Sequence, residues 1–90
     1  MRVTHTELKE AFAASARTQT RTYGNRTLRL FPDVWLEVQR PGTPEEPVRG
    51  FGMEDGAALC VFVLVGKGAP RVSKLDPKDH VFVIRGGPAG

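Results

Sequence analysis

The sequence predicts an α+β domain in which one N-terminal helix packs on a bent, mainly antiparallel sheet or half-open barrel of five to seven short strands. A pattern of helical period lies near the N-terminus, and the rest of the chain consists of short β-type runs separated by turn residues. The connections are short enough for hairpins, so parallel crossovers are not expected. We assign residues 1–85 to a single domain and residues 86–90 to a flexible C-terminal tail.

The helix is expected over about residues 5–17. Thr4 is a suitable N-cap and Glu7 stands three residues later, which is the pattern of a capping box. Its mostly apolar stripe has the spacing i, i+3, i+4, i+7 and i+8, and consists of Leu8, Ala11, Phe12, Ser15 and Ala16. We expect Leu8 and Phe12 to anchor the helix on one face of the sheet.

A hairpin is expected over residues 18–31. Threonines alternate with other side chains up to Tyr23, and Gly24-Asn25 then provides a two-residue turn. Such a turn pairs Tyr23 with Arg26 and puts Arg21 on the same face as both. The alternative is a frayed helix end followed by a loop.

Further strands are expected at residues 34–40, 48–53, 57–65, 71–75 and 80–85. The segments that separate them are expected to be turns or loops, at 32–33, 41–47, 54–56, 66–68 and 76–79. The run 34–40 alternates, with Val34, Leu36 and Val38 expected inward and Trp35, Glu37 and Gln39 outward.

The run 57–65 is apolar at every position, so it lacks the alternation of a strand with one solvated face. Its odd-numbered residues from Leu59 to Val65 are expected on one face of the sheet, and Cys60, Phe62 and Leu64 on the other. One helix covers one face. The second face then requires a sheet that folds over on itself, a second copy of the chain, or a different partner.

Composition excludes several ways of stabilising so small a chain. Ninety residues bury only about 60–65% of their unfolded surface. The single cysteine, Cys60, excludes an intrachain disulfide, and His5 and His80 belong to no cluster with the spacing of a zinc site. Oligomerisation is therefore the expected source of added stability.

No catalytic or ligand-binding motif is present, so we expect no enzyme activity, cofactor, metal or small-molecule substrate. The apolar run is too short to span a membrane, which requires about 20 residues, and the N-terminus has no apolar segment typical of a signal peptide. We therefore expect a cytoplasmic protein without membrane contact.

The leading functional hypothesis is a small protein-binding or assembly module, such as an accessory subunit or inhibitor, that self-associates or docks on another protein. A tryptophan on the outward side of a strand is a suitable interface anchor. The candidate interface residues are Trp35, Glu37, Phe62 and Leu64.

The alternative is nucleic-acid binding by the segment 17–29. Its candidate residues are Arg17, Arg21, Tyr23, Arg26 and Arg29. Arginine suits phosphate oxygens and tyrosine stacks on unpaired bases, although the same charges also protect a solvated edge hairpin from aggregation. A second alternative is a metal-independent ribonuclease that combines Tyr23, Arg21 and Arg26 with His80.

Overall fold

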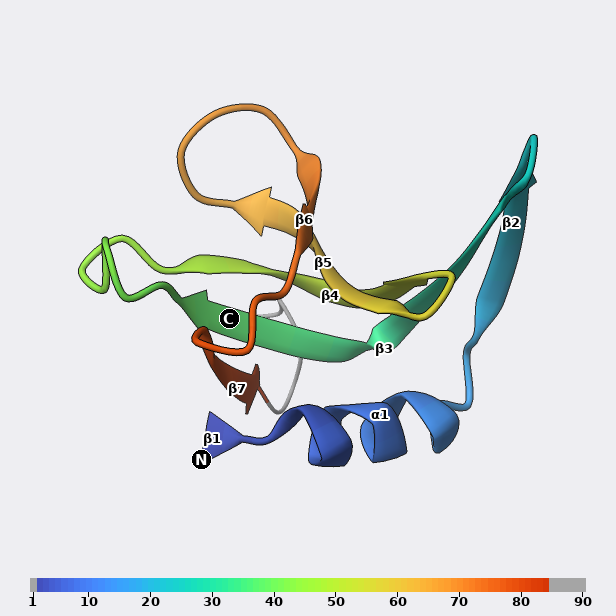
Figure 1. Ribbon diagram of the computed structural model, residues 1–90, viewed down its shortest axis with the longest axis horizontal. Coiled ribbons are helices and arrows are strands. Elements are labelled where there is room, and N and C mark those ends of the chain that lie inside the picture. Colours follow the sequence, from blue (N-terminus) through green and yellow to red (C-terminus); the bar gives the residue numbers. More distant parts are fainter. Residues whose placement is uncertain (1, 85–90) are drawn as a thin grey trace.

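The computed structural model describes residues 2–84, which contain one helix and seven strands (Figure 1). The elements are β1 (Arg2–Val3), α1 (His5–Ala13), β2 (Gln19–Tyr23), β3 (Arg26–Gln39), β4 (Val48–Asp55), β5 (Ala58–Val65), β6 (Arg71–Lys74) and β7 (His80–Ile84). They form an open antiparallel sheet in the order β1-β7-β3-β4-β5-β6, and β2 also pairs with β3. The predicted α+β class is confirmed, whereas β1 was not predicted and the tail at 86–90 lies outside the described residues.

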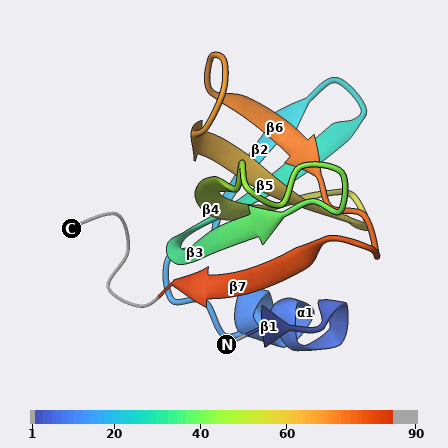
Figure 2. The ribbon, with the colours of Figure 1, turned by 90° about the vertical axis from the view of Figure 1, so that its left-hand side faces the viewer.

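Helix α1 begins as predicted. The Thr4 amide donates to the Glu7 carboxylate at 3.0 Å, and the Glu7 amide donates to the Thr4 hydroxyl at 3.1 Å, which completes the capping box. Leu8 and Phe12 are its buried residues. Figure 2 shows α1 beside β1 and β7, at one end of the sheet. No helix within residues 2–84 is long and apolar enough to cross a membrane.

The helix ends at Ala13, four residues before the predicted end. The cause is Asp33, whose carboxylate accepts hydrogen bonds from the Ser15 hydroxyl and, at 3.0 Å, from the Ala16 amide. The Ala16 amide therefore donates to a side chain and not to a helical carbonyl, and the two bonds hold the end of the helix beside β3. The hydrogen bond from Ser15 lowers the pKa of Asp33 below its usual value.

The predicted hairpin is confirmed, including its register. Tyr23 pairs with Arg26 and Arg21 pairs with Leu28 across a turn in which Gly24 has φ +60°. We call residues 19–27 the arm, because Figure 1 shows this ribbon projecting from the rest of the sheet. Every residue of β2 is exposed.

The turn predicted at 32–33 is wrong, because β3 continues through it. The pairing with β4 shifts register between Phe31 and Trp35, so the intervening residues form a bulge. Pro32 fits a bulge because it has no amide hydrogen for the sheet, and its carbonyl accepts the Trp35 indole N–H at 3.0 Å. The bulge divides one edge of β3 between β2, paired at 26–30, and β7, paired at 35–39.

The core lies between α1 and one face of the sheet, which we call the covered face. Phe12 from the helix stacks on Phe31 with ring centroids 4.2 Å apart and an interplanar angle of 8°. The sheet residues of this core are Phe31, Val34, Leu36, Val38, Val48, Leu59, Val61, Val63 and Val81, with Leu75 from the loop after β6. The inward positions predicted for 34–38 are thus confirmed.

Two glycines of β4 allow this close packing. A Cβ atom at Gly52 would lie 2.2 Å from Cε1 of Phe12, and one at Gly50 would lie 1.6 Å from the carbonyl oxygen of Phe62. Neither separation is sterically allowed, so the helix and β5 approach bare backbone at these points. Phe51, between the two glycines, therefore points to the opposite side of the sheet.

Candidate functional site

We call the opposite side of the sheet the open face, because no helix or strand among residues 2–84 packs over it as α1 packs over the covered face. Its residues follow from the strand register and include Trp35, Glu37, Arg49, Phe51, Phe62, Val72, Phe82 and Ile84. Val72 is 45% exposed and the aromatic side chains are half-buried, whereas Leu36 and Val61 on the covered face are at 0%. Met53 and Cys60 share the open face and are buried.

A row of aromatic rings crosses the three central strands of the open face. The ring centroids of Trp35 and Phe51 are 6.2 Å apart at 72°, and those of Phe51 and Phe62 are 4.9 Å apart at 18°. Edge-to-face and offset-stacked rings of this kind support one another and provide a rigid apolar surface.

The polar groups at the centre of the open face neutralise each other. Arg49 Nε lies 3.2 Å from Glu37 Oε2, and these two residues are directly opposite in the register of β3 and β4. The Gln39 amide donates to the same carboxylate at 3.3 Å. The charges of Glu37 and Arg49 beside the aromatic row therefore cancel.

Three of the four predicted interface residues, Trp35, Glu37 and Phe62, lie together on the open face. Leu64 does not follow the predicted alternation, because a bulge opposite Arg49 and Gly50 makes it an extra residue of β5. Leu64 is 42% exposed, and beyond it Val65 turns to the open face, contrary to the prediction that it shares a face with Leu59, Val61 and Val63.

Phe51 is the main residue of this face that the sequence prediction missed. The signal was present in the alternation Gly50-Phe51-Gly52, since glycines on the side of the helix place the phenylalanine on the other side. Val72, Phe82 and Ile84 were missed because the registers of β6 and β7 are set by long-range pairing.

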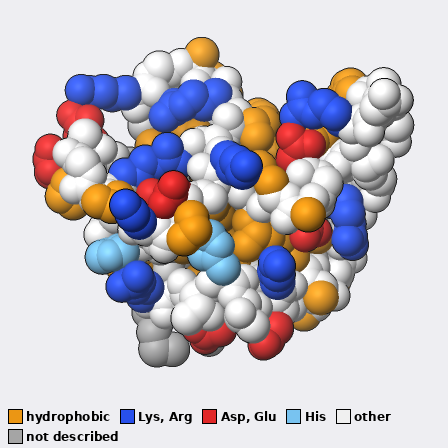
Figure 3. Space-filling view, in the orientation of Figure 1, with side chains coloured by type: hydrophobic (Ala, Val, Ile, Leu, Met, Phe, Trp, Pro, Cys, Tyr) orange, Lys and Arg blue, Asp and Glu red, His pale blue; other side chains and the backbone are white. Residues whose placement is uncertain are grey.

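Two of the predicted nucleic-acid residues are engaged by acidic side chains of β4. Arg26 pairs with Asp55, and Arg29 lies 3.5 Å from Glu54. Arg29 also lies over the ring of Phe31, on the covered side of the sheet. Figure 3 shows basic and acidic side chains interspersed over the face of the molecule that it presents, rather than one continuous basic surface.

The other three candidates of the basic segment are exposed. Tyr23 is 61% exposed, and Arg21 shares its face of the arm. Arg17 is exposed in the link between α1 and β2, with its amide donating to the Ser15 hydroxyl at 3.4 Å. These residues come from the arm and its base, outside the aromatic row.

The structure does not assemble the groups considered for catalysis. Tyr23 pairs with Arg26 at one end of β3, and His80 pairs with Gln39 at the other end. Cys60 on β5 is separated from β7 by β4 and β3, and burial raises the pKa of its thiol. Within the described part of the chain, no three His, Cys, Asp or Glu side chains cluster closely enough to hold a metal ion.

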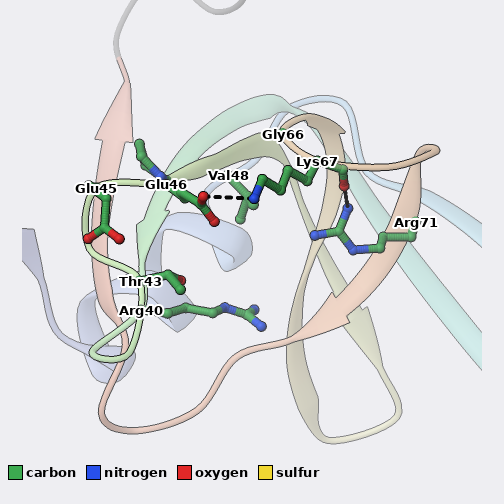
Figure 4. Close-up of a pocket in the computed structure, with 9 residues that line it drawn as sticks. Arg40, Thr43, Glu45, Glu46, Val48, Gly66, Lys67 and Arg71 are labelled. Atoms are coloured by element: carbon green, nitrogen blue, oxygen red, sulfur yellow. Dashed lines mark hydrogen bonds and ion pairs between the residues drawn. The ribbon is translucent and has the colours of Figure 1, made fainter.

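A polar pocket of about 390 Å3 lies between the segment after β3 and the loop that joins β5 to β6 (Figure 4). Lys67 Nζ lies 2.8 Å from Glu46 Oε1 across this pocket, and Arg71 donates to the Lys67 carbonyl at 2.7 Å. Arg40 enters from below in Figure 4, and its Nη2 donates to the Ser73 hydroxyl at 2.6 Å. The pocket therefore contains one ion pair, Lys67 with Glu46, and Arg71 is held by a backbone carbonyl.

Comparison with known proteins yields no match. No family model fits the sequence, and neither a curated protein nor a solved structure is similar to it. The open face is the most distinctive part of the surface of this chain.

Proposed function

We propose that this protein is a non-catalytic docking module that binds another protein chain through the open face. The observation that carries the proposal is the apolar row Trp35–Phe51–Phe62 on a sheet face over which no described element packs. Aromatic side chains at the centre of a surface are typical anchors of protein interfaces.

The aliphatic residues around the aromatic row favour a protein partner over a nucleic acid. Val72 and Val65 are each about half exposed, beside the row on β6 and β5. Branched aliphatic side chains do not stack on bases, whereas they gain about 25 cal/mol per Å2 when apolar protein surface covers them. Covering several such side chains stabilises a complex by an amount comparable with the stability of a small domain.

Site-specific photo-crosslinking in cells tests this proposal. A photoreactive amino acid replaces Val72 on the open face, and the control places it at Thr22, an exposed strand position on the other side of the arm. We expect crosslinked protein adducts from position 72 and not from position 22. Adducts that nuclease removes, or no adducts from position 72, would reject the proposal.

A second candidate is nucleic-acid binding by the arm, for which the observation is that exposed Tyr23 stands on the same face as Arg21. Stacking on the ring and contact with phosphate require this arrangement. Binding to single-stranded oligonucleotides across a salt series tests it, since phosphate contacts weaken steeply as salt rises. Absence of binding at low salt, or binding unchanged by Arg21→Glu, would reject this candidate.

A further inference from the structure

We infer that the occupant of the open face is a second copy of this chain, bound face to face. The inference rests on the proposed function, because it names the partner of the same surface. Three properties of the molecule carry it, namely the charge balance of the face, the charges on its free edge strand, and its area.

The charged residues on the central strands of the open face form internal pairs. Glu37 pairs with Arg49 beside the aromatic row, and Asp55 pairs with Arg26 near the arm. A partner of strong single-sign charge gains little from a neutralised surface, whereas a second copy meets it without like-charge repulsion at the centre. At the centre of the face, this balance favours a copy of the face over an acidic peptide or a polyanion.

Two further cations of the open face, which belong to neither of these ion pairs, lie on edge strands of the sheet. Arg2 is on β1, opposite Phe82, and Lys74 is on β6, opposite Cys60. An apolar centre with charged residues at the margin is the usual anatomy of a protein interface. Long side chains at the margin keep their charged ends in water when two faces meet.

The charges on the free edge of β6 disfavour edge-to-edge strand pairing, which is the other way in which two copies of a sheet associate. Two copies of β6 paired antiparallel about the Val72–Ser73 bond place Arg71 of each chain opposite Lys74 of the other. Like charges directly opposite one another destabilise a strand pair, and such residues on edges prevent growth of a sheet. Association is therefore expected through the face and not through this edge.

The area of the open face matches a weak dimer. Five strands from β7 to β6, spaced about 4.8 Å apart and about five residues long, give a footprint of about 400 Å2. Two faces then bury about 800 Å2, without counting the area added by protruding side chains, which is below the value of about 1,200 Å2 for stable interfaces and within the range of weak, transient ones. We expect a dimer that dissociates at micromolar concentrations.

Analytical ultracentrifugation from about 1 µM to about 1 mM tests the inference. The mass is expected to rise from one chain to two, and Val72→Lys should weaken association at least about tenfold because a charge is then buried at the seam. Thr22→Lys adds the same charge at an exposed position of the arm, and it should associate as the wild type does. The urea midpoints of both variants at the lowest concentration verify that they fold.

Charge reversal provides an independent variant of the face. Arg49→Glu leaves two carboxylates side by side at the centre of each open face, and it should weaken the dimer, whereas the double variant Glu37→Arg/Arg49→Glu should restore it. A chain that stays monomeric at the highest concentration would overturn the inference. A dimer unaffected by Val72→Lys and Arg49→Glu would do so too, because another surface would then hold it.

The failure of this inference is distinguishable from that of the docking function. Crosslinks from position 72 to a different protein, together with a monomeric purified chain, would exclude the second copy and leave docking intact. Absence of any protein crosslink from position 72 would reject both.

Discussion

The substitution Gly52→Ala provides a sharp test of how the helix covers one face of the sheet. The new methyl group would lie 2.2 Å from Cε1 of Phe12 and 2.6 Å from its Cζ atom. The ring has little room to retreat, because it is only 2% exposed and stacks on Phe31 at 4.2 Å. Helix α1 must therefore move away from the sheet or the stack must break.

The expected loss follows from these contacts. Overpacking of a tight core costs about 1–3 kcal/mol, and loss of the aromatic stack adds about 0.5–1.5 kcal/mol. We therefore expect Gly52→Ala to lower the free energy of unfolding by about 2–4 kcal/mol. This is a large share of the stability of a domain of this size.

Equilibrium unfolding in urea at one fixed protein concentration measures this loss, since association shifts stability with concentration. The matched control is Gly42→Ala in the loop after β3, where no atom lies within 4 Å of the added methyl group. Phe12→Leu in the Gly52→Ala background should recover part of the loss by making room. If Gly52→Ala stays within about 0.5 kcal/mol of the control, the packing of α1 on bare backbone is refuted.

Three further predictions concern other parts of the fold. Gly50→Ala should yield little folded protein, because its methyl group meets the Phe62 carbonyl at 1.6 Å and neither backbone gives way; a normal circular dichroism spectrum and melting temperature would contradict this. Burial raises the pKa of the Cys60 thiol, so the stability contributed by the neutral thiol is complete below the unfolded pKa of about 8.5 and declines as pH rises. Cys60→Ala should therefore flatten the dependence of unfolding free energy on pH above that value. Rapid chemical labelling of the thiol in the native protein would refute its burial. NMR titration should place the Asp33 pKa below about 3.9, and Ser15→Ala should raise it; an unchanged value would exclude the hydrogen bond as the cause.

Local patterns were sufficient to predict the elements whose signals lie within a few residues. The capping box at Thr4 and Glu7 located the start of α1, and Gly24-Asn25 fixed the register of the hairpin. The class of the fold followed from these elements and from the alternation at 34–38. Each of these signals depends only on residues within one turn or one strand, so long-range contacts do not alter the structure that it predicts.

Features that depend on distant contacts could not be predicted from the sequence. The end of α1 is set by Asp33, eighteen residues beyond the serine that it accepts from. The bulge that displaces Leu64 arises from the pairing of β5 with β4, and a run without alternation gives no warning of a shift. The compensation of Arg26 by Asp55 likewise joins residues far apart in sequence.

The candidate face was predicted in part for the same reason. Trp35, Glu37 and Phe62 were assigned to it from alternation within their own strands. Phe51 completes the aromatic row only when β4 lies between β3 and β5. A single sequence contains no statement of strand order, so the row as a unit becomes visible only in the folded sheet.

Docking through the open face requires that this face is uncovered in the monomer and covered in the complex. NMR with a soluble paramagnetic probe measures this for Trp35, Phe62 and Val72 at low and high protein concentration, with exposed Tyr23 of the arm as the internal control. We predict strong broadening of all four residues at low concentration, and protection of the three face residues alone as concentration rises. Equal broadening at every concentration, or protection of Trp35, Phe62 and Val72 already in the dilute monomer, would contradict docking of two copies through this face.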